Sequence, residues 1–464
     1  MNSSARCSLP GSSIRKGRGR DLKAGKTLNL NYPDMVSTAF VKIWGTTAGA
    51  IAWDDATGIG SFEFEPSFLK TGPDLAPLMM PLAVSEGRIW SFPELRRSEV
   101  FKGVPGLLAD VLPDRFGNML IDAWLARRGR PAGSMNPVEV LCYIGKRGMG
   151  ALEFEPPIPK GSNTSTKIEI GEMVSLANEI LSGRTGFSAN LSGDKAKALS
   201  DILKIGTSAG GARAKAVIAF NSATGEVRSG QAGVPAGFEH WIVKFDGVSD
   251  KQLGGTFGYG RVEMAYHLMA KVCGIEMTEC RLLEENGRAH FMTRRFDRTD
   301  DGEKLHMQSL CAMRHFDFNE VSSFGYEQLF ETLRLLRLPY PRSEQLFRRM
   351  VFNVLARNCD DHTKNFAFVM TRDGRWDFSP AYDLCHTYNP DNPWVSHQAL
   401  SVNGKRTDIT RDDFLEVAKQ MNIKKDKIII DQVNDAVQNW SKYAKETGVA
   451  GKLEKSIRQT LLKV

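Results

Sequence analysis

The chain has 464 residues, of which 42% are hydrophobic and 25% are charged, and its formal net charge is +7. This length allows two or three domains, each able to bury its own core, and no run of residues approaches the roughly 18 apolar residues of a membrane-spanning helix. The seven cysteines are scattered and form no Cys-x-x-Cys pair. This pattern argues against a disulfide framework and a zinc site, and it indicates a reducing cytoplasm.

The positive charge is concentrated at the beginning of the chain. Residues 1–34 hold seven Lys or Arg and two Asp, a net of +5, which leaves +2 for the rest. The segment is rich in Ser, Gly and Arg and has no apolar periodicity, so we expect a disordered basic extension. It also lacks the apolar core of a secretory signal. Met35 is then the expected native start, and a basic arm that binds nucleic acid is the alternative.

The remaining residues change their pattern along the chain. Residues 39–64 alternate and turn at glycines, which predicts a β-meander, and a helical part follows from Phe92 to Trp124. A polar stretch contains one helix, expected over residues 170–182, and helical periodicity dominates from about residue 305, with helices predicted over 326–338, 343–357, 411–421 and 427–446. The expected boundaries are 35–157 for an N-terminal α/β domain, 158–200 for a linker, 201–297 for a β-rich lobe and 298–464 for a helical lobe.

The β-rich lobe carries a candidate phosphate-binding loop and a candidate cation. Small residues between Ile205 and Lys215 would let backbone N–H groups approach a phosphate, just before an apolar strand. Lys244 lies in the alternating strand Trp241-Ile-Val-Lys-Phe245, and a lysine there is costly to bury without an anion. A plain Gly-Gly turn, and an edge strand on which Lys244 is a solubilising gatekeeper, are the alternatives.

The helical lobe contains an acid, an amide and a second acid in phosphotransferase order. Four residues separate Asp360 from Asn365 in Asn-Cys-Asp-Asp-His-Thr-Lys-Asn, and Asp383 follows the next hairpin. Kinase catalytic loops use this interval to aim a carboxylate at the substrate hydroxyl and an Asn at magnesium. Asp360 would be the base, Asn365 and Asp383 the Mg²⁺ ligands, and Lys364 would neutralise the transferring phosphoryl group. A solvated acidic turn that caps a helix is the alternative, but the flanking apolar helix and strand clamp the cluster between core elements.

With these motifs the chain resembles the HipA family of serine/threonine kinases, the toxins of type II toxin–antitoxin systems. The matching residues lie in the same order over about residues 38–400, and they are Leu112-Pro-Asp-Arg115, Gly210 to Lys215, Trp241 to Phe245, Arg295-Phe-Asp-Arg298, Leu305-His-Met-Gln308, Asn358 to Asn365 and Ser379 to Asp383. The Asp-Phe-Gly and His-Arg-Asp signatures of eukaryotic kinases are absent. The resemblance implies an α+β, bilobal protein-kinase-like fold with an added N-terminal α/β domain and a mostly helical C-terminal lobe.

The resemblance also implies that ATP and Mg²⁺ are bound between the two lobes. Main-chain groups of Arg294-Arg295-Phe296 would form the adenine hinge, although Arg295 and Asp297 could instead form a structural ion pair. Ser208 matches a position at which family members phosphorylate themselves, and a phosphate there would repel nucleotide. The implied ATP-binding residues are Gly210, Gly211, Ala212, Arg213, Ala214, Lys215, Lys244, Arg294, Arg295, Phe296, His362, Thr363, Lys364, Asn365, Tyr382 and Asp383.

For the biological role, the resemblance implies growth arrest by phosphorylation of a translation component such as an aminoacyl-tRNA synthetase. It also implies neutralisation by a small helix-turn-helix antitoxin, with operator DNA as a partner only within that complex and with no membrane partner. Two other classes stay open: a small-molecule phosphotransferase that uses the same loop, and a catalytically silent co-repressor in a DNA complex. The presence of Lys244, Asp360, Asn365 and Asp383 argues against the silent co-repressor.

Overall fold

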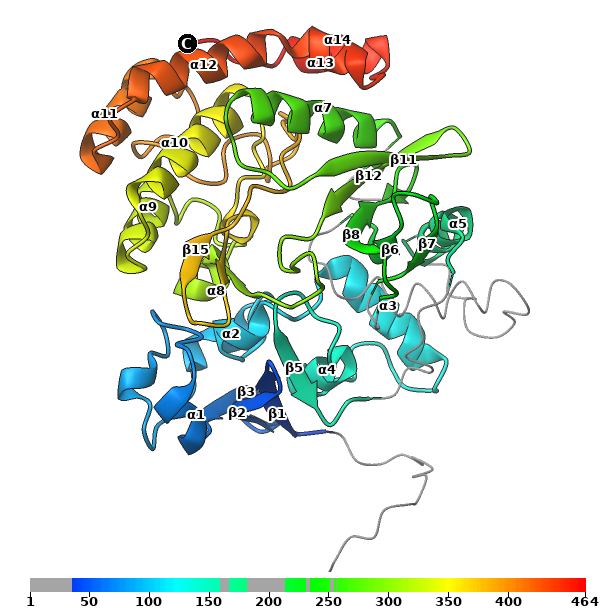
Figure 1. Ribbon diagram of the computed structural model, residues 1–464, viewed down its shortest axis with the longest axis vertical. Coiled ribbons are helices and arrows are strands. Elements are labelled where there is room, and N and C mark those ends of the chain that lie inside the picture. Colours follow the sequence, from blue (N-terminus) through cyan, green and yellow to red (C-terminus); the bar gives the residue numbers. More distant parts are fainter. Residues whose placement is uncertain (1–35, 159–166, 182–212, 231–233, 251–253, 256) are drawn as a thin grey trace, which may run out of the picture. The chain divides into compact units, whose positions relative to one another are not determined.

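The computed structural model describes residues 36–158, 167–181, 213–230, 234–250, 254–255 and 257–464 (Figure 1). The predicted basic extension over residues 1–34 therefore lies outside the described residues. The first described part, residues 36–158, is called the N-terminal region below. Its antiparallel sheet has the order β4 (Ile89–Trp90), β3 (Ile59–Phe64), β2 (Thr46–Asp54), β1 (Thr38–Ile43) and β5 (Leu152–Glu155). The predicted β-meander is confirmed as β1 to β3.

Short helices complete the N-terminal region. They are α1 (Pro66–Thr71), η1 (Leu82–Val84), η2 (Pro93–Arg97), α2 (Gly106–Ala109), α3 (Arg115–Ala126) and α4 (Pro137–Ile144). The predicted helical part is thus confirmed, but in pieces: residues 98–105 separate η2 from α2, and residues 110–114 separate α2 from α3. The second break contains Pro113, which lacks the N–H group that a continuous helix needs. This interruption makes Asp114 the N-cap residue of α3. At the start of α2, a Cβ on Gly106 would lie 2.3 Å from the carbonyl oxygen of Ala312 in the helix α8 (Leu310–Arg314), so only glycine allows these two helices to approach this closely.

A second antiparallel sheet forms the β-rich part. Its order is β11 (Cys280–Glu285), β12 (Arg288–Arg294), β8 (Glu239–Lys244), β6 (Lys215–Phe220) and β7 (Val227–Ser229), with a short ribbon of β9 (Ser249–Asp250) and β10 (Gly254–Gly255). The helix α5 (Ile170–Leu181) confirms the prediction over 170–182. The helix α7 (Tyr259–Val272) packs along β12 (Figure 1). A Cβ on Gly260 would lie 1.9 Å from the carbonyl oxygen of Ala289, so this packing requires glycine.

The last part combines a small sheet with most of the helices. The sheet has the order β13 (His306–Ser309), β14 (Ala367–Met370) and β15 (Trp376–Phe378), and it confirms the hairpin predicted after Asn365. The helices are α8 (Leu310–Arg314), α9 (Tyr326–Leu335), α10 (Tyr340–Leu355), η3 (Thr363–Asn365), α11 (Arg411–Met421), α12 (Asp426–Gln438), α13 (Trp440–Glu446) and α14 (Gly451–Arg458). The helices predicted over 326–338, 343–357 and 411–421 are confirmed, with ends that differ by up to three residues.

The prediction of one helix over 427–446 is wrong. The structure divides this segment into α12 and α13 at Asn439. The side-chain amide of Asn439 donates to the carbonyl oxygen of Asp435 at 2.8 Å. An Asn side chain that bonds its own helix backbone in this way competes with continued helical hydrogen bonding, which accounts for the break.

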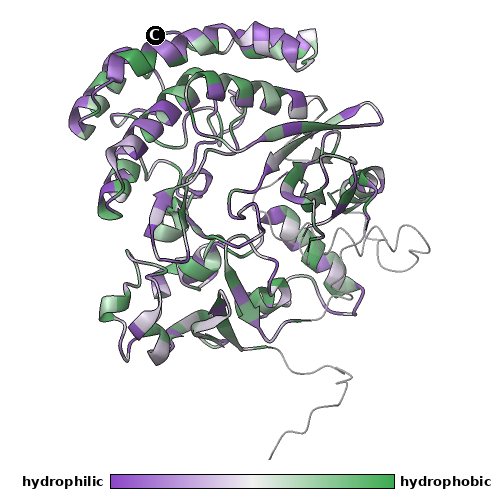
Figure 2. Ribbon diagram, in the orientation of Figure 1, coloured by the Kyte–Doolittle hydropathy of each residue, from purple (hydrophilic) through white to green (hydrophobic). Residues whose placement is uncertain are grey.

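Two apolar cores hold the described residues together. One core joins the N-terminal region to α5 and to the inner strands of the second sheet, and the other joins α7 to α9 through α13. In Figure 2, purple and green residues alternate along the C-terminal helices, as expected when one side is buried and the other exposed. All six cysteines among the described residues are buried and form no disulfide. None of the described helices combines the length and the apolar character that crossing a bilayer requires.

Candidate active site

The two adjacent aspartates of the segment 358–365, called the catalytic loop below, have opposite surroundings. Asp361 is 1% exposed and accepts hydrogen bonds from the hydroxyl of Tyr326 at 2.6 Å, the backbone N–H of Ala399 at 2.7 Å and the side-chain amide of Gln398 at 3.1 Å. Burial raises the pKa of Asp361 to about 6 in spite of these bonds. The Asp-Asp-His cluster is therefore not a solvated helix cap, because one of its carboxylates anchors the loop to the core.

Asp360, by contrast, presents its side chain to solvent with 48% exposure. Its backbone is fixed on both sides, since its N–H donates to the hydroxyl of Thr387 at 3.0 Å and its carbonyl accepts from the side-chain amide of Asn365 at 2.7 Å. The ring of His362 stacks on Phe318, with 4.8 Å between centroids, and His362 Nε2 lies 3.6 Å from Asp360 Oδ1. The loop thus holds an accessible carboxylate on a rigid backbone, which is what a general base needs.

Lys244 lies inside a three-residue charge cluster. Its ammonium group is ion-paired with Glu263 of α7 and with Asp383, and its side chain is 15% exposed. Burial alone would lower the pKa of Lys244, but the two carboxylates outweigh burial and raise it. The edge-strand alternative is wrong, because β8 lies between β12 and β6.

Glu263 was not identified from the sequence. It sits on α7 among buried apolar residues such as Val262, Ala265 and Tyr266. One signal could have found it. Glu263 is an acidic residue at a helix position expected to be buried, and the buried strand lysine Lys244 requires a carboxylate partner.

The second cation of the predicted phosphate site is Lys215, which pairs with Lys244 across β6 and β8 in the sheet register. Lys215 is 5% exposed; burial lowers its pKa, and the Asp383 carboxylate opposes that shift. Ala214 is buried, and the guanidinium of Arg213 lies 4.9 Å from the ring centre of Tyr259. The predicted loop residues Gly210, Gly211 and Ala212, and the predicted autophosphorylation site Ser208, lie outside the described residues.

The predicted magnesium ligands have the right chemistry for that ion. The Asn365 amide nitrogen is used by the Asp360 carbonyl, which leaves its amide oxygen as the atom to face a cation. The nearby lysines Lys244 and Lys215 lower the pKa of Asp383 against the effect of burial, so Asp383 is a carboxylate at neutral pH. One amide oxygen and one carboxylate are a donor set that suits Mg²⁺ held together with substrate phosphates. Clusters of three or more His, Cys, Asp or Glu that could hold a metal ion are absent among the described residues.

A residue of the N-terminal region forms an ion pair with the catalytic loop. Asp114 Oδ1 accepts from Lys364 Nζ at 2.5 Å, across 250 positions of sequence. Burial would lower the pKa of Lys364, but the Asp114 and Asp110 carboxylates outweigh it and raise it. The hydroxyl of Tyr382 also donates to the Lys364 carbonyl at 2.7 Å. Asp114 belongs to the motif that carries the family resemblance, but the sequence alone indicated no role for it.

Several groups of the predicted adenine hinge already form hydrogen bonds and ion pairs within the protein. The Arg295 guanidinium forms a buried ion pair with Asp297, with Nη2 at 2.6 Å from Oδ2, so the structural alternative for these two side chains is confirmed. The backbone N–H groups of Arg294 and Arg295 donate to the carbonyls of Glu279 and His240, and they are not free for a base. Within the hinge, this leaves the main chain of Phe296 and the carbonyls for the predicted contact.

The side chain of Thr363 is buried beneath the loop. It is 1% exposed, and its hydroxyl donates to the carbonyl of Phe316 at 2.7 Å. Its side chain therefore supports the loop, and its predicted contact with ATP stays a prediction.

Two cavities differ in how they relate to this chemistry. The recess lined by Arg213, Lys244, Tyr259 and Glu263 measures about 10 Å³, far too small for a nucleotide. A cavity of about 510 Å³ lies instead in the N-terminal region. The charged groups mark the candidate active site, and the larger cavity is a separate feature.

Comparison with known proteins assigns the chain to a family. The family model described as the HipA-like C-terminal domain matches residues 207–440, and the one described as the HipA N-terminal domain matches residues 39–155. The chain belongs to the HipA family. The resemblance drawn from the sequence motifs is thereby confirmed.

A solved structure and a curated relative are also similar to this HipA-family chain. The structure is that of the Shewanella oneidensis MR-1 toxin–antitoxin system HipA, HipB and its operator DNA complex, with a TM-score of 0.63 and 17% identity over 91% of this chain and 94% of that chain. This likeness confirms the α+β, HipA-like fold. The relative is named "Putative kinase Y4dM", from Sinorhizobium fredii (strain NBRC 101917 / NGR234), and is 24% identical over 239 residues. The match spans 47% of this chain and 55% of that protein, about half the length of each.

Proposed function

We propose that the protein is an ATP- and Mg²⁺-dependent serine/threonine kinase. The observation that carries the proposal is the pair of neighbouring aspartates: Asp361 is buried and anchors the loop, while Asp360 is exposed and held by Asn365. A loop built in this way aims one carboxylate outward at a fixed place beside an amide ligand. Kinase catalytic loops need that arrangement.

Each group has a role in this proposal. Asp360 accepts the proton of the substrate hydroxyl, and Lys364 lies next to Asn365 on the same loop to offset the charge of the transferring phosphoryl group. Lys244 and Lys215 bind the other phosphates, while Glu263 fixes Lys244, as the lysine–glutamate ion pair does in protein kinases. Mg²⁺ bound by Asn365 and Asp383 would neutralise phosphate charge. Phe296, whose ring lies 5.5 Å from that of Tyr382, closes the proposed adenine side.

The biological role follows from the family. We propose that the protein is a cytoplasmic HipA-like toxin that phosphorylates a translation component such as an aminoacyl-tRNA synthetase. Its other partner would be a helix-turn-helix antitoxin, with operator DNA contacted within that complex. The similar solved structure, a complex of HipA, HipB and operator DNA, supports these partners by analogy. Ser208 is the proposed autophosphorylation site.

The substitution Asp360→Asn tests the kinase proposal. It keeps the shape of the loop but removes the proton acceptor, so phosphoryl transfer is expected to fall on the order of 10²–10⁴-fold. Calorimetry with Mg-ATP beside a phosphorylation assay should show nearly unchanged nucleotide affinity. Full activity in this variant would contradict the proposal, and loss of ATP binding together with activity would assign Asp360 a structural role instead.

A further inference from the structure

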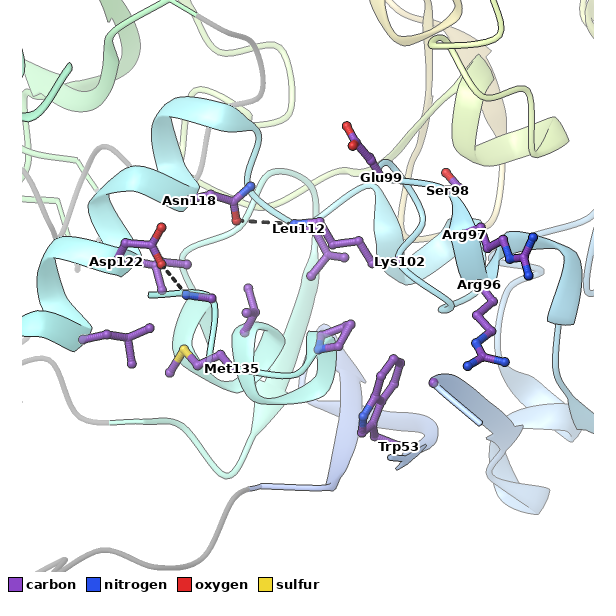
Figure 3. Close-up of a pocket in the computed structure, with 16 residues that line it drawn as sticks. Trp53, Arg96, Arg97, Ser98, Glu99, Lys102, Leu112, Asn118, Asp122 and Met135 are labelled. Carbon is purple, nitrogen blue, oxygen red and sulfur yellow. Dashed lines mark hydrogen bonds between the residues drawn. The ribbon is translucent and has the colours of Figure 1, made fainter. Parts of the chain in front are cut away.

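The cavity of about 510 Å³ in the N-terminal region lies between η2 on one side and α3 with the following turn on the other (Figure 3). Its volume is within the roughly 300–1,000 Å³ of ligand sites in proteins. The kinase chemistry proposed above uses none of its lining residues. It is therefore a candidate for a second binding site.

The cavity combines an apolar wall with cations that have no carboxylate contact. Trp53, Leu112, Ile121, Leu125, Met135 and Val140 provide the apolar wall. Three cations, Arg96, Arg97 and Lys102, also line it, and none of them forms an ion pair with any of the residues that the structure describes. The nearest polar contact of Lys102 is the side-chain oxygen of Asn118 at 3.5 Å (Figure 3).

Two acidic residues share the cavity, but they leave a positive excess. Asp122 accepts a hydrogen bond from the backbone N–H of Gly133 at 2.8 Å, and Glu99, which also lines the cavity, is exposed. Burial lowers the pKa of Lys102 although Asp114, Asp122 and Glu99 oppose that shift, so these carboxylates do not fully offset its loss of hydration. An anionic ligand would supply further negative charge, and the apolar wall would hold an apolar side chain beside it.

The wall of the cavity is connected to the catalytic loop in two places. Leu112 lines the cavity, and two residues further on Asp114 holds Lys364. On the other side, the hydroxyl of Ser98 donates to Asp317 at 2.5 Å. The next residue, Phe318, stacks on His362. A chain bound in the cavity would therefore lie beside the loop that carries Asp360.

We propose that this cavity is a docking site for an acidic, partly apolar peptide segment of the protein that the kinase phosphorylates. An extended occupant is favoured over a small metabolite because Arg96, Arg97 and Glu99 are exposed at the mouth, where the chain would continue outward. That the bound segment belongs to a phosphorylated protein rests on the proposed kinase function. Peptide binding itself does not need ATP, so the docking hypothesis and the kinase hypothesis can fail separately.

The test uses fluorescein-labelled synthetic peptides that carry Ser at varied distances from an Asp-Glu-Leu-Phe segment. Two matched pools replace the acids by Lys, or Leu-Phe by Ser-Ser. Fluorescence anisotropy with the full chain, without nucleotide, should show binding of the first pool about tenfold or more tighter than either control pool. Equal affinity for the acidic and basic pools would overturn the proposal.

Charge reversal then locates the site. Arg96→Glu/Arg97→Glu should weaken binding of the acidic pool by about tenfold or more. Lys452→Glu/Lys455→Glu, which changes the same charge on the exposed face of α14, should leave it unchanged. Met135→Trp, which fills the cavity without altering charge, should weaken binding as well. Wild-type affinity in both cavity variants would contradict the site.

Two further outcomes separate the alternatives. Displacement of the peptide by free citrate at micromolar concentration would identify a small-anion site and overturn the peptide assignment. Tight, Arg96-dependent binding of peptides that are never phosphorylated when Mg-ATP is added would support the docking site and count against the kinase function.

Discussion

Lys244 and Lys364 both belong to the candidate active site, and each is held by ion pairs, but their partners come from different parts of the chain. Lys244 is fixed by Glu263 and Asp383, which lie within the matched HipA-like C-terminal domain. Lys364 is fixed by Asp114, which belongs to the matched HipA N-terminal domain. Among the described residues, the partners of Lys244 on the proposed nucleotide side thus come from one family domain, whereas the partner of Lys364 on the proposed phosphoryl side comes from the other.

This difference has a functional consequence. A buried ammonium group keeps its charge only while carboxylates offset its loss of hydration, so each lysine is as well ordered as its partner. For Lys244 the partner sits on α7, which packs against the same sheet. For Lys364 the partner is the N-cap residue of α3 and directly follows Pro113. Any movement of the N-terminal region would disturb Lys364 before it disturbs Lys244.

The largest effect is expected from removing the Asp383 carboxylate. It is an ion-pair partner of Lys244 and also a proposed ligand of the metal ion. Asp383→Ala should abolish phosphoryl transfer in a radiolabelled-phosphate assay. The magnesium ion would lose its carboxylate ligand, and Lys244 would lose one of its two ion-pair partners. Thermal unfolding of the variant is the control for folding. Measurable turnover near that of the wild type would exclude Asp383 from the metal site.

The proposed catalytic series could be picked out from the sequence because its spacing is local, and its catalytic role stays a prediction. Asp360, Asn365 and the hairpin that leads to Asp383 fall within 24 residues, and both flanking elements were recognised. The partners Glu263 and Asp114 could not be found in this way. They are joined to their lysines only by tertiary packing, across 19 and 250 positions. For the same reason the sequence could not show that Arg295 and Thr363 turn inward, since their partners belong to other segments.

An intermediate effect is expected when the nucleotide-side lysine loses its partner on α7. Glu263→Gln keeps the size of the side chain but removes the charge that raises the pKa of Lys244. Lys244 would then be drawn toward Asp383 alone, and the KM for ATP should rise by about tenfold, since a charged hydrogen bond contributes roughly 1.5–3 kcal/mol. Steady-state kinetics at varied ATP measure this rise, and Glu263→Asp should restore part of the loss. An unchanged KM in Glu263→Gln would show that Lys244 does not need this partner.

The smallest effect is expected from a substitution of Asp114. It distinguishes the role of Lys364 from that of Lys244. Asp114→Asn removes the charge that holds Lys364 while Asp361 still anchors the loop and Lys244 keeps both partners. We therefore expect kcat to fall by a few-fold to about tenfold while the KM for ATP and the calorimetric affinity for Mg-ATP stay unchanged. The matched control is Glu153→Gln, which breaks another ion pair of the N-terminal region, with Lys304 at 2.8 Å, without touching the catalytic loop. It should lower the melting temperature but not kcat. If both variants lowered kcat equally, Asp114 would act through stability alone; if Asp114→Asn raised the KM for ATP instead, the two sides of the site would not be independent.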